Sequence, residues 1–206
     1  MMKISFKKFT FIHKLIFKNY SILRILQILE ALKLNLDEEV LDLGSKPSSN
    51  NVSNFINVKK KIIYADKNSQ DKSDLNIDLE NVNSDYNSKF KYVLLFNVLE
   101  HVFNFKNCVK NCYFFLKKDG FLYGTVPFFF RIHGSPNDYF RYTDQAIYKI
   151  LKDTGFNEIE IKILGGGIFL CFYNSIFMIT RRIPFFNNIM YIICILLDFI
   201  ISIFSK

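Results

Sequence analysis

The sequence of 206 residues predicts an α/β fold whose core is a doubly wound, mostly parallel sheet. Short apolar runs alternate with helical patterns between residues 39 and 164, which is the order of strand–helix–strand units. The run Tyr92–Phe96 is apolar on both faces, as expected of a strand covered on both sides. The prediction adds an amphipathic helix before this sheet and an apolar helical tail after it.

Each element follows from a local pattern. Apolar residues at helical spacing predict an amphipathic helix over 11–34. The expected strands are Glu39–Leu43, Lys61–Ala65, Tyr92–Phe96, Phe121–Val126 and the alternating Glu158–Leu164, with a weaker apolar stretch at Leu75–Leu79. The expected helices are a short one near Val52–Val58, Phe105–Leu116 ended by a glycine turn at Gly120, and Asp144–Asp153 capped by Thr143.

These patterns divide the chain into three parts. Residues 1–36 form a helical extension, residues 37–164 form the α/β domain, and residues 165–206 form an apolar helical segment. In the last part, Ile183–Phe204 approaches the ~20 residues that span a bilayer, but Asn187, Asn188 and Asp198 interrupt it. We therefore favour a helix on a membrane surface or packed on a partner over a spanning helix.

The net charge of +8 lies at the ends of the chain. Residues 1–33 carry +6 and residues 165–206 carry +2, while residues 34–164 are neutral. A nucleic-acid-binding domain would show basic residues on its folded core, so we expect no nucleic-acid partner. Basic flanks beside apolar runs suit an anionic membrane surface, with a solvated helix face as the alternative.

The cysteine pattern predicts neither a disulfide nor a metal site. Cys108 and Cys112 lie one helical turn apart within an apolar pattern, and the chain has no C-x-x-C pair. Four buried thiols fit a reducing compartment. Lysines interrupt any apolar core of a secretory signal, so we expect a cytoplasmic protein, peripheral on the inner face of the membrane if it is attached.

Polar residues follow three of the predicted strands, at the edge where ligands of parallel sheets bind. Asp42, Gly44 and Ser45 close the first strand, and Gly44 lets the backbone turn tightly near a ligand. Asp66 closes the second strand, where a carboxylate can accept hydrogen bonds from ribose hydroxyls. Asp78 holds a comparable place before the next strand. The G-x-G-x-x-G motif is missing, which argues against NAD or FAD.

A titratable pair follows the next strand. In LLFNVLEHV (94–102), the strand ends at Asn97, and Glu100 and His101 stand where a helix should begin. Together with VLDLGS (40–45), YAD (64–66), Asp78, LKKDGFLYGTVPF (116–128) and RIHGSPNDYFRYT (131–143), this string resembles the S-adenosylmethionine-dependent methyltransferases of the type 11 group. The P-x-D-Y-F-R-Y-T string (136–143) is similar to a subset associated with polysaccharide and cell-envelope biosynthesis.

The resemblance, which covers Glu39–Leu164, implies a Rossmann-like sheet of the methyltransferase type and S-adenosyl-L-methionine as cofactor. It makes Asp42 a donor-binding residue and places Gly44 and Ser45 near the methionine part of the donor. Asp66 would lie at the ribose, Asp78 near the adenine and Asn97 under the sulfonium. An oxygen acceptor would lose a proton, and His101 is the best-placed base because imidazole titrates near neutral pH. The alternative for His101 is a helix-start residue that bonds backbone.

The Arg131–Arg141 loop is the candidate acceptor site. It gathers Arg131, His133, Asp138, Tyr139 and Arg141 within eleven residues. Its guanidiniums suit an anionic acceptor, whereas an Asp138–Arg141 pair that only holds the loop is the competing interpretation. The expected acceptor is a small or lipid-linked saccharide, methylated on an oxygen.

Two departures from the resemblance leave an alternative open. Lys46-Pro47-Ser48 replaces the second glycine of the usual first loop, and the last, antiparallel strand of the fold is not evident. Either Ile168–Tyr173 forms that strand after the three glycines, or the tail covers the sheet edge. The chain could therefore be a weak or inactive methyltransferase-like domain that acts as a membrane-attached partner protein.

Overall fold

A computed structural model describes residues 6–48, 50–67, 75–134, 136–165, 167–180 and 182–204. The chain forms two compact units, which are described one at a time. The sheet unit is Glu30–Lys162, and the helical unit combines Met1–Leu29 with Ile163–Lys206.

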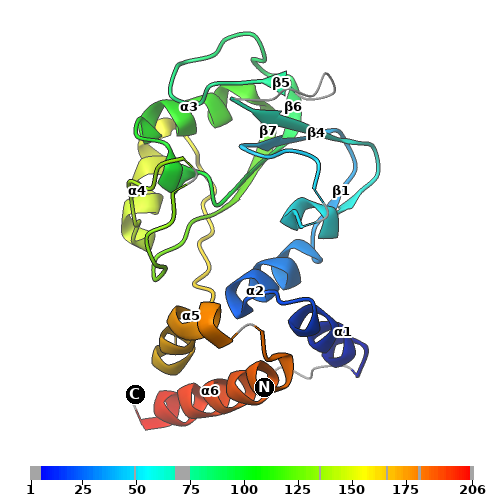
Figure 1. The fold of residues 1–206 in the computed structure, drawn as a ribbon. Helices are drawn as coiled ribbons and strands as arrows, with labels where there is room; N and C mark the ends of the chain where they lie inside the picture. Colours follow the sequence, from blue (N-terminus) through cyan, green and yellow to red (C-terminus); the bar gives the residue numbers. More distant parts are fainter. Residues whose placement is uncertain are drawn as a thin grey trace. The chain divides into compact units, whose positions relative to one another are not determined.

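A five-stranded sheet, parallel in every pairing, forms the centre of the sheet unit (Figure 1). Its spatial order is β5–β4–β2–β6–β7, so the central strand comes first in the chain and two strands lie on each side of it. The strands are β2 (Val40–Leu43), β4 (Ile62–Asp66), β5 (Leu75–Asn76), β6 (Phe90–Phe96) and β7 (Leu116–Thr125). This topology confirms the predicted doubly wound sheet and places its switch point between β2 and β6.

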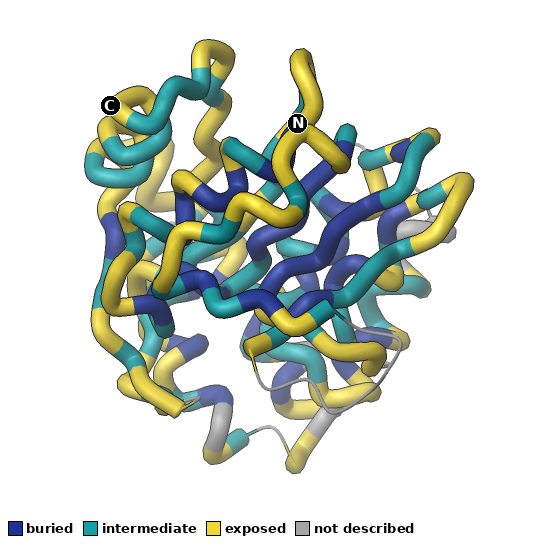
Figure 2. Tube along the Cα trace, turned by 90° about the horizontal axis from the view of Figure 1, so that it is seen from above, coloured by how far each residue is buried: buried dark blue, intermediate teal, exposed yellow. Residues whose placement is uncertain are grey.

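Alternate side chains of the inner strands enter two cores, one on each face of the sheet. Leu41 and Val93 pack with the helices α3 (Phe105–Phe115) and α4 (Asp144–Thr154). Val40 and Leu94 enter the core on the other face, where the covering elements are short: β1 (Asn35–Leu36), η1 (Val52–Phe55) and β3 (Asn57–Val58), with β1 and β3 paired in parallel. Figure 2 shows buried stretches in the interior of the molecule, and β2 and β6 are buried along most of their length. Each such Leu or Val contributes ~1.5–3 kcal/mol on burial.

Caps explain where the two helices begin and end. The Thr143 hydroxyl accepts the Ala146 amide at 3.1 Å, which starts α4 as predicted. Gly155 ends α4 in the left-handed conformation, with φ 118°. The Asn104 side chain likewise accepts the Asn107 amide and starts α3.

The predicted glycine turn after α3 is wrong. Leu116 is already extended and pairs with Phe90 in the sheet, whereas the next pair joins Tyr92 to Phe121. Residues 117–120 therefore bulge from β7, and Asp119 rather than Gly120 takes the left-handed conformation, with φ 59°. The Lys117 ammonium in this bulge bonds Glu38, and the Lys91 ammonium of β6 donates to the Asp119 carbonyl. The edge strand is therefore charged where it bulges.

The strand predicted over Glu158–Leu164 is also wrong, because the described stretch 156–165 belongs to no strand. Nor does Ile168–Tyr173 supply a last strand, since it lies in the helix α5 (Ile168–Thr180). Among the described residues, β7 is thus the final strand on its side of the sheet. The alternating pattern of 158–164 marks local β preference, but a strand also needs a partner edge.

The predicted helix over 11–34 divides into α1 (Phe6–Phe17) and α2 (Ile22–Ala31). Asn19 ends the first helix with φ 62°, and the Ser21 hydroxyl accepts the Arg24 amide at 3.3 Å to begin the second. The short helix predicted over 52–58 is only the single 3₁₀ turn η1.

In the helical unit, α5 pairs with α6 (Pro184–Phe204). Asp198 of α6 accepts the Phe169 and Leu170 amides at 2.9 and 3.0 Å, so it caps the start of α5. Asn187 is fully buried and accepts the Tyr173 hydroxyl. Two polar residues that interrupt the apolar tail thus have partners within the unit. By length and composition, Phe185–Phe204 is one helix apolar enough to cross a membrane, with mean hydropathy 2.0.

Candidate functional site

Asp42 is a buried carboxyl group near the end of the central strand. It is 3% exposed. Burial raises the pKa of Asp42 to about 6, although the hydroxyls of Ser53 and Ser45 act in the opposite direction. The group is therefore held close to its titration range at neutral pH.

Gly44 is required by two features of the turn that follows β2. Its φ of 66° is rarely adopted by residues with a side chain, and a Cβ here would lie 2.6 Å from Cγ2 of Val98. The residues after it are held by Asn51, whose side-chain amide donates to the Ser45 hydroxyl at 2.9 Å and to the Lys46 carbonyl at 2.7 Å. The loop that lacks the second glycine is thus ordered by a side chain.

Asp66 ends β4 beside Gly44, because the pairing of Leu43 with Ala65 brings the next residues of both strands together. Asp78 differs, since its carboxylate is engaged by its own loop. The Glu80 amide and the Asn81 side chain each donate to it at 3.0 Å, and the Lys67 ammonium lies 3.0 Å away. Burial opposes these contacts but does not outweigh them, so the pKa of Asp78 is lowered.

Asn97 follows β6 in a left-handed conformation, with φ 54°. Its amide donates to the Thr125 carbonyl at 2.8 Å, and the Thr125 hydroxyl donates to its Oδ1 at 3.2 Å. The end of β7 therefore orients Asn97 at the end of β6.

The Glu100–His101 pair lies in a 3₁₀ turn, η2 (Leu99–His101), rather than at the start of a longer helix. Glu100 is fully buried, and within the described structure neither of its carboxylate oxygens has a hydrogen-bond partner. Burial accordingly raises the pKa of Glu100, against the opposing charge of His101. His101 places Nδ1 2.5 Å from the Asn137 carbonyl and Nε2 3.7 Å from Oε1 of Glu100.

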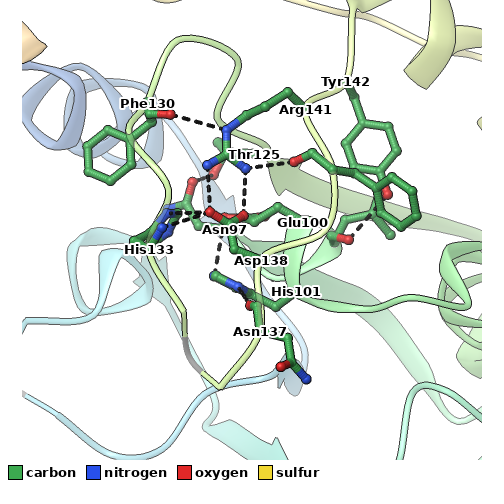
Figure 3. Close-up of polar contacts among 12 residues, drawn as sticks. Asn97, Glu100, His101, Thr125, Phe130, His133, Asn137, Asp138, Arg141 and Tyr142 are labelled. Carbon is green, nitrogen blue, oxygen red and sulfur yellow. Dashed lines mark hydrogen bonds and ion pairs between the residues drawn. The ribbon is translucent and has the colours of Figure 1, made fainter.

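The Arg131–Arg141 loop is folded around Asp138, whose side chain is 2% exposed (Figure 3). Arg141 donates Nη1 to Oδ1 at 2.6 Å and Nη2 to Oδ2 at 2.7 Å. The His133 amide donates to Oδ2 at 2.8 Å, and the His133 Nδ1 lies 3.3 Å from the same oxygen. These contacts hold the pKa of Asp138 far below its usual range, chiefly through Arg141.

The same loop is fastened to the 3₁₀ turn by backbone bonds. The Tyr139 and Phe140 amides both donate to the Glu100 carbonyl, at 2.8 and 3.4 Å. The Tyr142 hydroxyl donates to the Leu99 carbonyl at 3.3 Å. The loop therefore covers Glu100 and brings the His133 ring against the His101 ring, with centroids 4.9 Å apart.

Most of the predicted site residues fall into two groups, and Asp78, Arg131 and Tyr139 lie outside both. Asp42, Gly44, Ser45, Asp66 and Asn97 lie at the same edge of three neighbouring strands. A second group comprises His101, His133, Asp138 and Arg141. Arg131 and Tyr139 are exposed; Tyr139 packs on Phe103.

Sequence reasoning noticed Glu100 but assigned it no role. The only signal was a glutamate inside the apolar string V-L-E-H-V, and its burial depends on the loop that covers it. The carbonyl of Asn137 and the hydroxyl of Thr125, which orient His101 and Asn97, have no signal in the sequence.

A scan against models of protein families finds no match to this chain, and neither does a search of curated proteins. Among solved structures, the phosphoethanolamine N-methyltransferase 2 of Haemonchus contortus, in complex with S-adenosyl-L-methionine, is similar at 17% identity with a TM-score of 0.51. The match covers 76% of this chain and 42% of that protein, so the chain spans less than half of that length. The likeness shows the fold: the chain has the Rossmann-like α/β sheet of the methyltransferase type, as predicted.

Proposed function

We propose that the chain binds S-adenosyl-L-methionine and transfers its methyl group to a small or lipid-linked acceptor. The observation that carries this proposal is the convergence of Gly44, Asp66 and Asn97 at the ends of three neighbouring strands, on either side of the switch point. The similar Haemonchus contortus methyltransferase was solved in complex with this donor, which supports the proposal.

The donor would extend across the strand ends. Gly44 and Ser45 would line its methionine part together with Asp42, Asp66 would accept the ribose hydroxyls, and Asn97 would face the sulfonium. The carboxylate of Asp78 already has three partners, so we assign Asp78 the shaping of the loop near the adenine rather than a direct contact.

Methyl transfer from a sulfonium is a direct displacement, so alignment of donor and acceptor supplies most of the catalysis. A hydroxyl acceptor must also lose its proton. His101 is placed for this role because a bond from Nδ1–H to the Asn137 carbonyl leaves Nε2 as the basic nitrogen. We propose a saccharide hydroxyl as acceptor, on the resemblance of residues 136–143.

The contacts of the Arg131–Arg141 loop distinguish its two possible roles, which are to bind an anionic acceptor and to hold the loop in place. The Arg141 guanidinium donates hydrogen bonds to Asp138 and to three backbone carbonyls, those of Phe130, Arg131 and Phe140. These bonds favour a role in holding the loop. Arg131 is exposed, so its guanidinium is the better candidate to bind an anionic acceptor.

Donor binding is the first test. Calorimetry with S-adenosyl-L-methionine and S-adenosylhomocysteine should give a saturable isotherm, and Asp66→Ala should weaken binding at least tenfold. Asp85→Ala, which removes an exposed carboxylate elsewhere on the sheet unit, is the matched control. No detectable binding at millimolar ligand would contradict the proposal and favour the non-enzymatic partner protein.

Acceptor chemistry is the second test. Transfer of a labelled methyl group to lipid-linked saccharides from a membrane extract should require the folded chain, and the labelled product should carry an O-methyl sugar. If His101 acts as the base, His101→Gln should lower the rate ~10²–10⁴-fold while donor affinity is kept. Label in an amine or in protein would exclude the saccharide.

We also propose that α6 attaches the protein to an anionic membrane surface. One side of the helix exposes large apolar residues at helical spacing: Ile192, Ile195, Leu196, Phe199 and Ile203. Exposed apolar surface of this extent is typical of interaction sites, and the basic termini would add attraction to anionic lipids.

Sedimentation with vesicles tests this attachment. The triple variant Ile195→Gln, Phe199→Gln, Ile203→Gln should lose binding to phosphatidylglycerol vesicles, whereas Tyr148→Gln, which changes an exposed aromatic residue on α4, should not. Equal binding by the triple variant would show that α6 is not the anchor.

A further inference from the structure

We propose that Glu100, His101 and His133 form a binding site for one divalent transition-metal cation. Each residue contributes one ligand atom, and these three atoms lie within 4.8 Å of one another. This goes beyond methyl transfer, and it departs from the expectation of no metal site, because the three ligands are brought together by tertiary structure.

The buried carboxylate is the first reason. Both oxygens of Glu100 are buried and lack a hydrogen-bond partner among the described residues, which is a costly arrangement for a carboxylate. Oε1 faces Nε2 of His101 at 3.7 Å. A carboxylate oxygen and the lone pair of an imidazole nitrogen repel each other at that distance, and a proton or a cation bound between them would remove the repulsion.

The orientation of both imidazoles is the second reason. Histidines that bind metals usually donate their other ring nitrogen to a carbonyl or carboxylate, which fixes the tautomer. His101 has Nδ1 at 2.5 Å from the Asn137 carbonyl. His133 has Nδ1 at 3.2 Å from the Arg131 carbonyl and 3.3 Å from Oδ2 of Asp138. In both rings Nε2 is left as the nitrogen available to a cation.

The ligand set selects the class of metal. Two imidazole nitrogens and one carboxylate oxygen suit Zn²⁺, Fe²⁺, Co²⁺ or Mn²⁺ rather than Ca²⁺ or Mg²⁺, which prefer oxygen ligands. Ligand atoms around such an ion lie ~3–3.5 Å apart, so the three ligand atoms, now within 4.8 Å of one another, would approach further on binding. Three protein ligands leave a position open for water or substrate.

A cation here would occupy the lone pair of His101 that could otherwise accept a proton. In that state His101 would not act as the base; the cation would lower the pKa of a bound hydroxyl, which would release its proton to solvent water. Metal binding itself needs neither the donor nor the acceptor, so it can be tested apart from the proposed methyl transfer.

Titration of chelator-treated protein with Co²⁺, followed by visible absorption and by competition with Zn²⁺, tests the site. We expect one equivalent to bind, with at least a 100-fold loss in His133→Ala, and with a smaller loss in Glu100→Gln that keeps the packing. His13→Ala removes the one histidine outside the cluster and should leave affinity unchanged.

Three outcomes would overturn the proposal. These are no saturable binding up to ~1 mM Co²⁺, affinity unchanged in His133→Ala, or a thiolate charge-transfer band that assigns the ion to Cys108 and Cys112. Because His133 is only partly buried, its alanine variant should fold, and circular dichroism would verify this.

Discussion

Arg141 holds Asp138 with two parallel hydrogen bonds, and the same carboxylate accepts the backbone amide of His133. This arrangement ties the two ends of the Arg131–Arg141 loop together. Because backbone bonds fasten the loop to Glu100, the pair also fixes what covers that buried carboxylate.

Arg141→Lys should loosen the loop. A lysine keeps the charge but cannot make the bidentate pair, and hydrogen bonds to charged groups are worth ~1.5–3 kcal/mol each. We expect a loss of about 2 kcal/mol in the free energy of unfolding, measured by urea titration. The control is Lys149→Ala, which removes an exposed pair with Asp153 and should change stability by less than ~0.5 kcal/mol. Equal effects of both variants would show that the Asp138 pair adds no more than a surface pair.

Asp42→Asn should remove a pH dependence. The pKa of Asp42 is raised to about 6 by burial, so between pH ~4 and ~6 the folded state binds more protons than the unfolded state. The stability of the natural protein should therefore fall as pH rises through this window, by on the order of 3 kcal/mol from this group. Urea unfolding at pH 4 to 7 measures the difference between the two proteins, and parallel curves would contradict the raised pKa.

Gly44→Ala should destabilise the sheet unit by ~2–4 kcal/mol, because it combines a left-handed backbone with a contact of 2.6 Å on Val98. Val98→Ala should relieve the contact but not the backbone conformation. The double variant should thus lose less than the sum of the single losses in thermal unfolding. Strict additivity would mean that the backbone conformation alone requires glycine.

Asp198→Ala should destabilise the helical unit by ~1–2 kcal/mol through loss of the cap on α5. Ser202→Ala, one turn further along α6, should change little since its hydroxyl only bonds the Phe199 carbonyl. Thermal unfolding followed by circular dichroism compares the two. If Asp198→Ala were as stable as Ser202→Ala, the cap would have no energetic role.

The elements that sequence predicted well are those whose signal is local and strong. β2 and β6 are buried apolar runs, β4 is an apolar run that is only partly buried, and α4 carries its cap at Thr143 and its stop at Gly155. The strand predicted over Glu158–Leu164 did not form, because an alternating run becomes a strand only when it pairs with the edge of a sheet, and this pairing is not a local property. The predicted helix over 11–34 divides at Asn19 and Ser21, residue types that often end and begin helices. The long apolar periodicity concealed this signal.

The candidate site divides along the same line. Asp138 and Arg141 stand three residues apart, so their pairing could be anticipated from spacing. The meeting of His101 with His133 could not, because it depends on a loop returning over the 3₁₀ turn. Burial of Glu100 is likewise a product of tertiary structure rather than of its neighbours in the chain.

The all-parallel sheet has a consequence for how the chain reaches its native state. Val40 pairs with Ile62 on one side and with Tyr92 on the other, so the central strand gains neither partner through a hairpin. Each pairing requires closure of a long chain segment before any contact compensates the lost entropy. We expect α3 and α4 to form early and docking of β6 onto β2 to limit the folding rate, with apolar strand edges exposed to aggregation until that step is complete.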